Sequence, residues 1–430
     1  MMRALPLVFL AGFLAAQEAP LAFTGARLIP VSGPEIPNGV LLIENGKIRA
    51  VGAAGAVAIP AGARRIDAAG QVILPGLVDT HSHIGGVEGA DSSAPIQPDA
   101  YVLDAINVGD SKFQKAQAGG ITVANLMPGS GHLLSGRTVY LKLRDGRTID
   151  DLLIRLPGGA VAGGIKMANG TNSRRASPFP GTRAKSAALV RAEFIKAREY
   201  AEKIRAAGDD AAKLPARDLR LEPLAEALSG KRVVHFHTHR HDDILTVLRL
   251  KREFGFQAVL HHVSDAWMVA GEIAASGVLG SSLIMIDSPG GKLEAKDFRL
   301  ANGAALEKAG ALAGFHTDDS ITDSRLFLRS AGLAVRGGMS RDKAVYALTL
   351  AGAVMLGLED RIGSLEAGKD ADLVILSGDP LSVYTKVLET WVDGVRVFNR
   401  ADPKDYLYAV GGYGASHDSA AQGHFCWGEE

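Results

Sequence analysis

The chain has 430 residues, and 47% of them are hydrophobic, so its length and composition allow one large buried core and a smaller one. Its 47 Lys and Arg balance 47 Asp and Glu, and the absence of a basic run excludes the usual electrostatic signature of a nucleic-acid partner. The single cysteine, Cys426, excludes an internal disulfide, so core packing has to hold the fold.

Residues 1–19 have the pattern of a secretory signal peptide. Arg3 precedes an apolar run, and small residues follow at Ala15 and Ala16. The run is too short for a comfortable transmembrane helix, and no later stretch is long and apolar enough to span a bilayer. We therefore expect an exported protein, periplasmic or extracellular, without a membrane anchor. An apolar N-terminal strand is the alternative.

Short β-rich segments occupy residues 20–70 and return at 361–402. Turn pairs such as Asn45-Gly46 and Asp393-Gly394 interrupt them and indicate hairpins. Because both ends of the chain carry this pattern, we expect one composite β-sandwich domain formed by the N- and C-terminal segments. The tail, 403–430, has no assignment.

Residues 71–360 alternate strand-like and helix-like segments. One helical face is marked by Val190, Phe194 and Ala197 and continues to Ile204, and Ser340 is expected to cap a helix that runs to Leu358. Such alternation predicts βαβ units and a parallel sheet, and the span fits a (β/α)8 TIM barrel of ~250 residues. The expected strands are a first one in 72–79, then 121–127, 160–168, 232–239, 256–263, 277–286 and 311–318, with an eighth in 138–144 or 152–156.

Histidines gather at the ends of these expected strands. His81 and His83 are two residues apart, so on a strand both side chains point to the same side. A lone pair of this kind is also compatible with two polar loop residues. However, eight of the twelve histidines fall at four strand ends: His81 and His83, then His235, His237 and His239, then His261 and His262, and finally His316. Barrel active sites lie at the C-terminal strand ends, and imidazole is a common zinc ligand, so the pattern predicts a divalent-metal site.

Two motifs resemble a known family. GLVDTHSHIG (76–85) and IGSLEAGKDADLVILSGDPL (362–381) resemble the first-strand motif and the return into the β domain of the amidohydrolase superfamily, in its imidazolonepropionase-like and prolidase-like branch. The resemblance covers nearly all of the chain after residue 19. It implies a metal-dependent (β/α)8 barrel with a composite β-sandwich domain, which hydrolyses amide, peptide or related bonds, or deaminates rings.

The resemblance also implies individual ligands. Lys166, in IKMANG, resembles a strand-four lysine that is carbamylated in many relatives and bridges two metal ions. The alternative is a lysine that binds a substrate carboxylate or lies on the rim. His261 stands where the family often has Glu and gains no role, whereas His235 or His239 could support the ligands from outside. The full set of implied metal ligands is His81, His83, Lys166, His237, His262 and Asp318.

These residue types predict hydrolysis of a C–N bond by a metal-activated water, with Asp318 as general base and a histidine such as His262 supporting the oxyanion. Zinc is the default metal, as one or two ions, although such sites also accept manganese, iron or cobalt. The alternatives are a deaminase, a lactone or phosphotriester hydrolase on the same scaffold, or a non-catalytic scaffold protein.

The predicted substrate is a short peptide or another small molecule such as a cyclic amide. Arg suits a carboxylate, so loop residues Arg174 and Arg175 are candidate contacts, although solvated loop arginines explain them equally well. Tyr140, His239 and Asp287 are further candidates. Relatives form dimers and larger assemblies, so the resemblance is compatible with a homo-oligomer.

Overall fold

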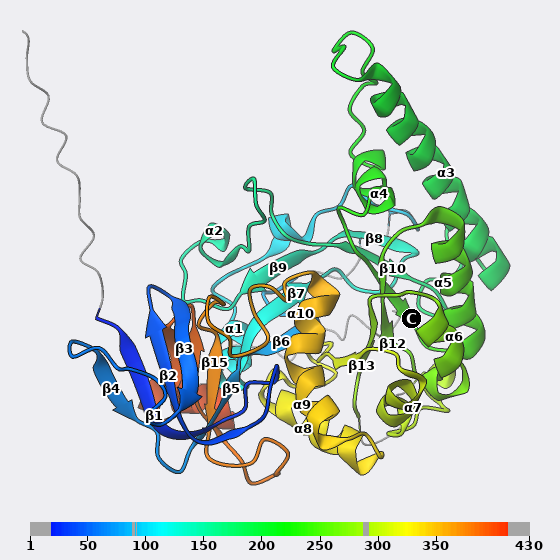
Figure 1. Ribbon diagram of the computed structural model, residues 1–430. Coiled ribbons are helices and arrows are strands. Elements are labelled where there is room, and N and C mark those ends of the chain that lie inside the picture. The colour runs from blue at the N-terminus through cyan, green and yellow to red at the C-terminus, as the bar shows by residue number, and fades with distance from the viewer. Residues whose placement is uncertain (1–18, 88–90, 92, 287–291, 412–430) are drawn as a thin grey trace, which may run out of the picture.

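The computed structural model describes residues 19–87, 91, 93–286 and 292–411. Residues 1–18 of the expected signal peptide, Asp287, Cys426 and most of the C-terminal tail lie outside the described residues. Figure 1 shows a β-rich part on one side of the molecule and a larger part with strands and helices on the other.

An eight-stranded sheet draws on both ends of the described chain. Its order is β17-β16-β15-β5-β1-β2-β3, and β4 pairs with β1. β5 lies parallel to β1 and antiparallel to β15, so N-terminal and C-terminal strands meet at the middle of the sheet. Its strands are β1 (Leu21–Leu28), β2 (Ile36–Glu44), β3 (Lys47–Ala53), β4 (Arg64–Asp67), β5 (Val72–Pro75), β15 (Leu373–Leu376), β16 (Val387–Val392) and β17 (Val395–Asn399).

The two predicted hairpin turns are confirmed. Asn45 and Gly46 join β2 to β3 with φ of 52° and 72°, and Asp393 and Gly394 join β16 to β17 with φ of 50° and 75°. Positive φ at both central residues matches the twist of a two-residue hairpin, and Asn-Gly and Asp-Gly tolerate it best.

The larger part is mixed α/β. One sheet has the order β14-β13-β12-β11-β10-β8, in which β10 to β14 run parallel, and a second has the order β6-β7-β9. Neither sheet closes on itself within the described residues, so the closed barrel of the sequence prediction is not shown. The strands are β6 (Leu77–Ser82), β7 (Ile121–Leu126), β8 (Leu134–Arg137), β9 (Val139–Lys142), β10 (Ile165–Ala168), β11 (Val234–Thr238), β12 (Ala258–His262), β13 (Gly280–Leu283) and β14 (Ala313–Phe315).

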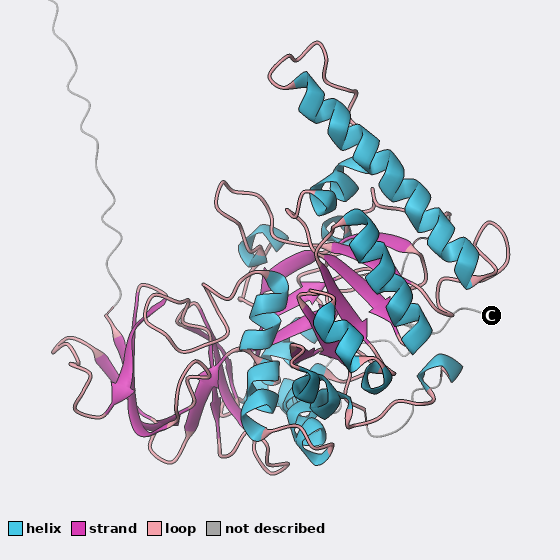
Figure 2. Ribbon diagram, turned by 45° about the vertical axis from the view of Figure 1, so that its right-hand side comes forward, coloured by secondary structure: helices cyan, strands magenta, loops and turns pink. Residues whose placement is uncertain are grey.

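Helices surround these strands in Figure 2. The α-helices are α1 (Lys112–Ala118), α2 (Ile149–Leu152), α3 (Arg183–Ala207), α4 (Leu221–Leu228), α5 (His241–Phe254), α6 (Ala270–Ala275), α7 (Asn302–Ala309), α8 (Phe327–Arg336), α9 (Arg341–Leu348), α10 (Leu350–Leu356) and α11 (Pro403–Val410). Short 3-10 turns are η1 (Val102–Ala105), η2 (Ala266–Met268), η3 (Leu293–Ala295) and η4 (Ser324–Leu326). Within the described residues, no helix combines the length and the apolar character needed to cross a membrane.

The predicted first strand is two strands. β5 joins the eight-stranded sheet and β6 joins the sheet with β7, and Gly76 lies between them. A Cβ atom at Gly76 would approach Thr122 Oγ1 to 2.1 Å, so only glycine lets the chain pass β7 this closely. The apolar run thus spans the junction between the two parts of the molecule and ends at His81 in the larger part.

The two helix predictions hold in part. Val190, Phe194 and Ala197 lie on the buried face of α3, but Ile204 is 38% exposed, so the predicted face is not buried as far as this residue. Ser340 caps α9 by accepting the backbone N–H of Lys343. The predicted single helix to 358 is broken, since Thr349, at φ −130° and ψ −91°, separates α9 from α10.

The eighth predicted strand matches β9, which falls in 138–144. This strand is antiparallel to β7, and β8 just before it is antiparallel to β10. Residues 152–156 form no named strand. Leu152 ends α2, Leu153 makes an isolated bridge with Leu141 of β9, and Arg155 makes another with Val161.

Candidate metal centre

His81, His83 and Asp318 converge on one point. His81 lies on β6, His83 follows that strand, and Asp318 follows β14. The Nε2 atoms of His81 and His83 are 3.2 Å apart, and they lie 3.2 and 2.9 Å from Asp318 Oδ1. All three side chains are buried, so two imidazoles and one carboxylate face each other away from bulk water.

Backbone and polar contacts hold these ligand-type residues in place. The N–H of Asp318 donates to the carbonyl of His81 over 2.9 Å, which ties the end of β14 to β6. Buried Asp79 accepts the N–H and hydroxyl of Thr317 over 3.0 and 2.5 Å. Burial raises the pKa of Asp79 to about 7, although its hydrogen bonds with Thr317 oppose that shift. His83 Nδ1 lies 2.8 Å from the carbonyl of Met127, which leaves Nε2 to face Asp318.

A second group consists of His237, His239 and His262. His237 lies on β11, His239 follows that strand, and His262 ends β12. One ring nitrogen from each side chain lies within 4.8 Å of the other two. His262 Nε2 also lies 4.0 Å from Asp318 Oδ2, so this group adjoins the first one.

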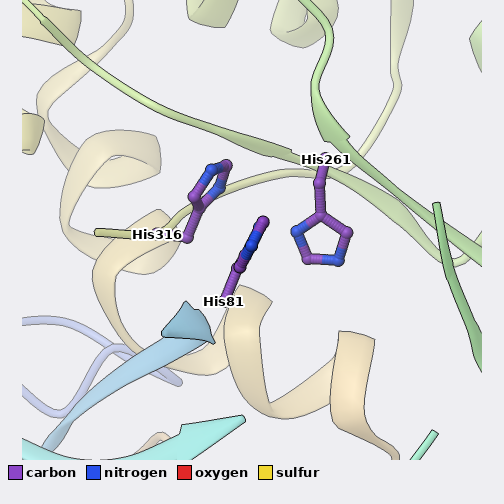
Figure 3. Close-up of side chains that lie close together, drawn as sticks. All are labelled: His81, His261 and His316. Carbon is purple, nitrogen blue, oxygen red and sulfur yellow. The ribbon is translucent and has the colours of Figure 1, made fainter. Parts of the chain in front are cut away.

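A third group, His81, His261 and His316, is shown in Figure 3. The ring of His81 stacks on His316 at a centroid distance of 4.9 Å and meets His261 edge-on at 5.0 Å. His316 Nδ1 lies 2.8 Å from Ser282 Oγ, and His261 Nε2 lies 3.0 Å from His235 Nδ1. His81 therefore belongs to two groups and packs against polar rings on several sides.

Lys166 joins the first group. Its Nζ lies 2.9 Å from His81 Nε2 and 3.1 Å from Met127 Sδ, and its side chain is fully buried on β10. The amine therefore lies beside the candidate ligands rather than on an outer rim.

Burial sets the protonation of these side chains. It lowers the pKa of His235 and of His316 to about 3, with the charge of Lys166 adding to the shift in both. The imidazoles of His235 and His316 are therefore neutral at neutral pH, which is the form that ligates metals. Burial acts to raise the pKa of Asp318, but the hydrogen bond and charge of His83 lower it below its ordinary range, so this carboxylate is ionised.

The donor set fits a divalent cation. Within the described residues, His81 Nδ1, both ring nitrogens of His237, and Nε2 of His239 and His262 are buried without a hydrogen-bond partner. Buried polar atoms are normally satisfied, and neutral imidazole with carboxylate is a typical ligand set for zinc. The six residues predicted as metal ligands, which are His81, His83, Lys166, His237, His262 and Asp318, lie in the first two groups.

Two predicted substrate contacts are engaged elsewhere. Arg174 Nε donates to the carbonyl of Gly170 over 3.0 Å. Arg175 donates to the carbonyl of Gly131 over 2.6 Å, and its guanidinium lies 4.0 Å from the ring centroid of Phe179. Both arginines thus support the loops that follow β7 and β10.

Tyr140 requires a correction. It is 3% exposed, packs in an apolar cluster with Val78 and Val123, and its hydroxyl lies 2.8 Å from His235 Nε2. This phenol offers no group to a substrate, because β9 turns it into the core. The fourth candidate, His239, belongs to the second histidine group.

The sequence prediction missed Lys292. This half-buried residue precedes η3, whose buried Glu294 accepts the N–H of Thr171 over 2.7 Å and ties η3 to the loop after β10. Burial lowers the pKa of His239, and the charge of Lys292 is the next largest cause. Lys292 has no carboxylate partner within the described residues. In the sequence, the only signal at Lys292 is the glycine-rich run SPGG (288–291) directly before it.

Comparison with known proteins assigns the family. Residues 158–398, more than half of the chain, match the model described as Amidohydrolase family. This chain belongs to the Amidohydrolase family. The family resemblance predicted from the sequence motifs is therefore confirmed, and hydrolysis of C–N bonds is the chemistry that the family shares.

A solved structure agrees closely with this amidohydrolase. An amidohydrolase from Thermotoga maritima MSB8 has a TM-score of 0.81 and 32% identity, over 88% of this chain and 100% of that one. A prolidase crystallised with N-methylphosphonate-L-proline has a TM-score of 0.56 at 15% identity, over 89% of this chain and 100% of that one, which speaks for the fold alone.

Three curated relatives differ in their named reactions. The amidohydrolase tasK of Hapsidospora irregularis is 27% identical over 394 residues, or 84% of this chain, and the match spans only 40% of its length. The 5-methylthioadenosine/S-adenosylhomocysteine deaminase of Symbiobacterium thermophilum is 25% identical over 84% of this chain and 85% of that protein. The imidazolonepropionase of Sphingopyxis alaskensis is 25% identical over 85% of this chain and 94% of that protein.

Proposed function

We propose that this amidohydrolase is a metal-dependent hydrolase that cleaves a C–N bond in a short peptide or a cyclic amide. The observation that carries the proposal is the convergence of His81, His83 and Asp318 within 3.2 Å of one another in a buried site. Five further histidines adjoin them, and several of their ring nitrogens have no other partner within the described residues.

His81, His83 and Asp318 would hold one ion, and His237 with His262 would hold a second. Lys166, as a carbamate, would bridge two ions, and its position 2.9 Å from His81 supports that role. A divalent ion, zinc by ligand type, supplies Lewis acidity that makes water easier to deprotonate and polarises a carbonyl oxygen.

Asp318 is the proposed general base. Its Oδ1 faces His81 and His83, whereas Oδ2 lies on the side of His262, 4.0 Å from Nε2. An ionised, buried carboxylate in this position can accept a proton from the attacking water through Oδ2 and return it to the leaving nitrogen. In a one-ion enzyme, His262 Nε2 would be free to support the oxyanion.

The (β/α)8 barrel is part of the proposal, as the larger domain within 71–360. The parallel run from β10 to β14 and the bond between Asp318 N–H and the His81 carbonyl support closure between β14 and β6. Residues 20–70 and 361–402 would form the composite β-sandwich domain. Export by residues 1–19 and assembly into a homo-oligomer also belong to the proposal, from the sequence pattern and from the family resemblance.

Lys292 is the proposed contact for a substrate carboxylate. It is a cation beside the second histidine group, and no described carboxylate neutralises it, whereas Arg174 and Arg175 bond to loop carbonyls. A carboxylate next to the scissile bond is typical of dipeptides, N-acyl amino acids and imidazolonepropionate-type rings.

A deaminase is the second candidate. The relative from Symbiobacterium thermophilum is named as one and matches most of this chain. A lactone or phosphotriester hydrolase would use the same ligands.

The test combines metal analysis with a substrate screen. We expect zinc or a similar ion to co-purify, and the zinc-loaded protein to hydrolyse at least one dipeptide, N-acyl amino acid or imidazolone. Ammonia release from methylthioadenosine alone would favour the deaminase. A protein that neither carries nor binds a divalent ion would contradict the enzyme proposal.

A further inference from the structure

We propose that His239 is a metal ligand, and that it completes a three-histidine cation site with His237 and His262. This inference deepens the proposed function and rests on it, because it assigns a complete protein ligand set to the second ion. The site would take zinc or another divalent ion that accepts imidazole.

The geometry of the three rings is that of a closed ligand set. The ring centroids of His237 and His262 are 4.2 Å apart, and His239 lies 4.7 and 4.8 Å from them. The exposed fractions of His237, His239 and His262 are 0%, 6% and 2%, so water cannot easily solvate their nitrogens. Three imidazoles held this close in a core need a shared partner.

The ring nitrogens that face the group lack other partners. Within the described residues, Nε2 of His239, Nε2 of His262 and both nitrogens of His237 make no hydrogen bond. A water molecule can donate only two hydrogen bonds, whereas a cation can accept a lone pair from all three rings. The unsatisfied set therefore favours a cation.

The opposite nitrogen of His239 is held by a second residue. His239 Nδ1 lies 2.8 Å from Ser264 Oγ, and the carbonyl of Ser264 accepts the side-chain amide of Asn302 over 2.9 Å. An outer partner on one nitrogen fixes the ring so that the other nitrogen faces the ion, as is usual for metal-ligating histidines. Ser264 is thus a positioning residue.

Backbone conformation at the end of β12 also points to a built site. His262 and Val263 have φ of 71° and 40°, which non-glycine residues rarely adopt. The N–H of Asp265 donates to the carbonyl of His239 over 3.0 Å, so the turn after β12 is tied to the residue after β11. Such strain is typical where a fold must aim a side chain.

One consequence concerns Lys166. Its amine contacts His81 in the first group, whereas the second ion would have three histidines of its own. The second ion should therefore remain bound when Lys166 is replaced by alanine.

The experiment is a zinc titration of the full chain in competition with a chromogenic chelator. We expect about two zinc equivalents for the unaltered chain and for Lys166→Ala, and about one for His239→Gln. His241→Gln is the matched control, since His241 lies two residues further on, is about half exposed and faces Asp265 instead. It should retain both equivalents. Ser264→Ala should weaken the second equivalent by about 10–100-fold.

Two zinc equivalents of unchanged affinity in His239→Gln would overturn the inference. So would a single equivalent in the unaltered chain, although the proposed function would survive that result. No zinc binding at all would contradict both. If His239→Gln fails to fold, a zinc-loaded crystal structure of the unaltered chain decides instead. Zinc within bonding distance of His237 and His262 but not of His239 would contradict the inference.

Discussion

Two buried polar clusters of this amidohydrolase differ in one respect. Where β9 meets the eight-stranded sheet, Lys142 pairs with Asp370 over 2.7 Å, with Asp372 over 3.0 Å, and with Asp393. At the strand ends of the larger part, several histidine nitrogens have no partner within the described residues. In the first cluster each carboxylate has a lysine partner inside the protein, although one oxygen of Asp372 has no hydrogen-bond partner within the described residues. This cluster has a structural task. The second cluster is complete only with a ligand. We call the first cluster, around Lys142, the joint, and the second, around the histidines, the site.

The pKa shifts support that distinction. Burial acts to raise the pKa of Asp370, but the charge of Lys142 outweighs it and lowers that pKa to about 2. For His81, by contrast, burial lowers the pKa and the charge of Lys166 lowers it further. Lys142 thus stabilises the charged form of Asp370, although burial raises the pKa of Asp372 in the same cluster. Around His81, by contrast, burial and Lys166 both favour the neutral imidazole that ligates metals.

The largest expected effect is on turnover. Asp318→Asn removes the proposed base and should lower kcat by about 10²–10⁴-fold, with thermal unfolding little changed. Steady-state rates on the best substrate of the screen, at saturating zinc, measure this. A normal kcat in the Asp318→Asn enzyme would show that Asp318 is not the general base.

The largest expected effect on stability lies in the joint. Lys142→Met leaves three carboxylates without their buried cation and should lower the free energy of unfolding by about 3–5 kcal/mol. Urea unfolding measures this, and Lys213→Met, on an exposed pair with Asp210, is the control expected to change little. Loss of zinc binding in a folded Lys142→Met protein would show that the two clusters are not independent.

Acid should destabilise the zinc-free chain. His235 and His316 have folded pKa values of about 3, below the ordinary value near 6.5, so each takes up a proton on unfolding between these limits. Stability is therefore full above about pH 6.5 and falls as the pH drops, by about 1.4 kcal/mol per pH unit for each histidine. Asp79, with its raised pKa of about 7, acts in the opposite direction between about pH 4 and 7, and burial also raises the pKa of Asp319 and Asp372. Other buried histidines whose pKa values burial lowers add to the loss of stability in acid. Urea unfolding between pH 7 and 4 measures the slope, and a flat profile would contradict the neutral histidine core.

The smallest expected effect is on substrate affinity. Lys292→Met should raise KM for a carboxylate-bearing substrate by about 10–100-fold, because a charge-assisted contact contributes about 1.5–3 kcal/mol. It should leave kcat and zinc content nearly unchanged. The matched control is Arg174→Met, whose guanidinium supports a loop carbonyl. Equal KM values in both variants would argue against Lys292 as the carboxylate contact.

Short-range patterns predicted the parts of the molecule that depend on neighbours in sequence. The period of two along a strand brought His81 and His83 together. Strand-end positions pointed to eight histidines, and the family resemblance singled out His237 and His262 among them. Hairpin turns at Asn45-Gly46 and Asp393-Gly394 followed from their own residues.

The sequence did not predict features that depend on contacts between residues far apart along the chain. The break at Gly76 is set by Thr122, and the burial of Tyr140 by its place on an antiparallel strand against His235. The grouping of His239 with His262 depends on the turn of backbone after β12. The position of Lys292 depends on Glu294 meeting the loop after β10.

The most direct test of the contrast between joint and site is equilibrium unfolding of the purified chain with excess zinc and with a strong chelator. An ion that binds only the folded state at about 100 times its Kd should raise the free energy of unfolding by about 2.7 kcal/mol. Lys142→Met should show the same zinc-dependent increment on a lower baseline. Unfolding curves that coincide with and without zinc would contradict the assignment of the histidine groups as cation sites.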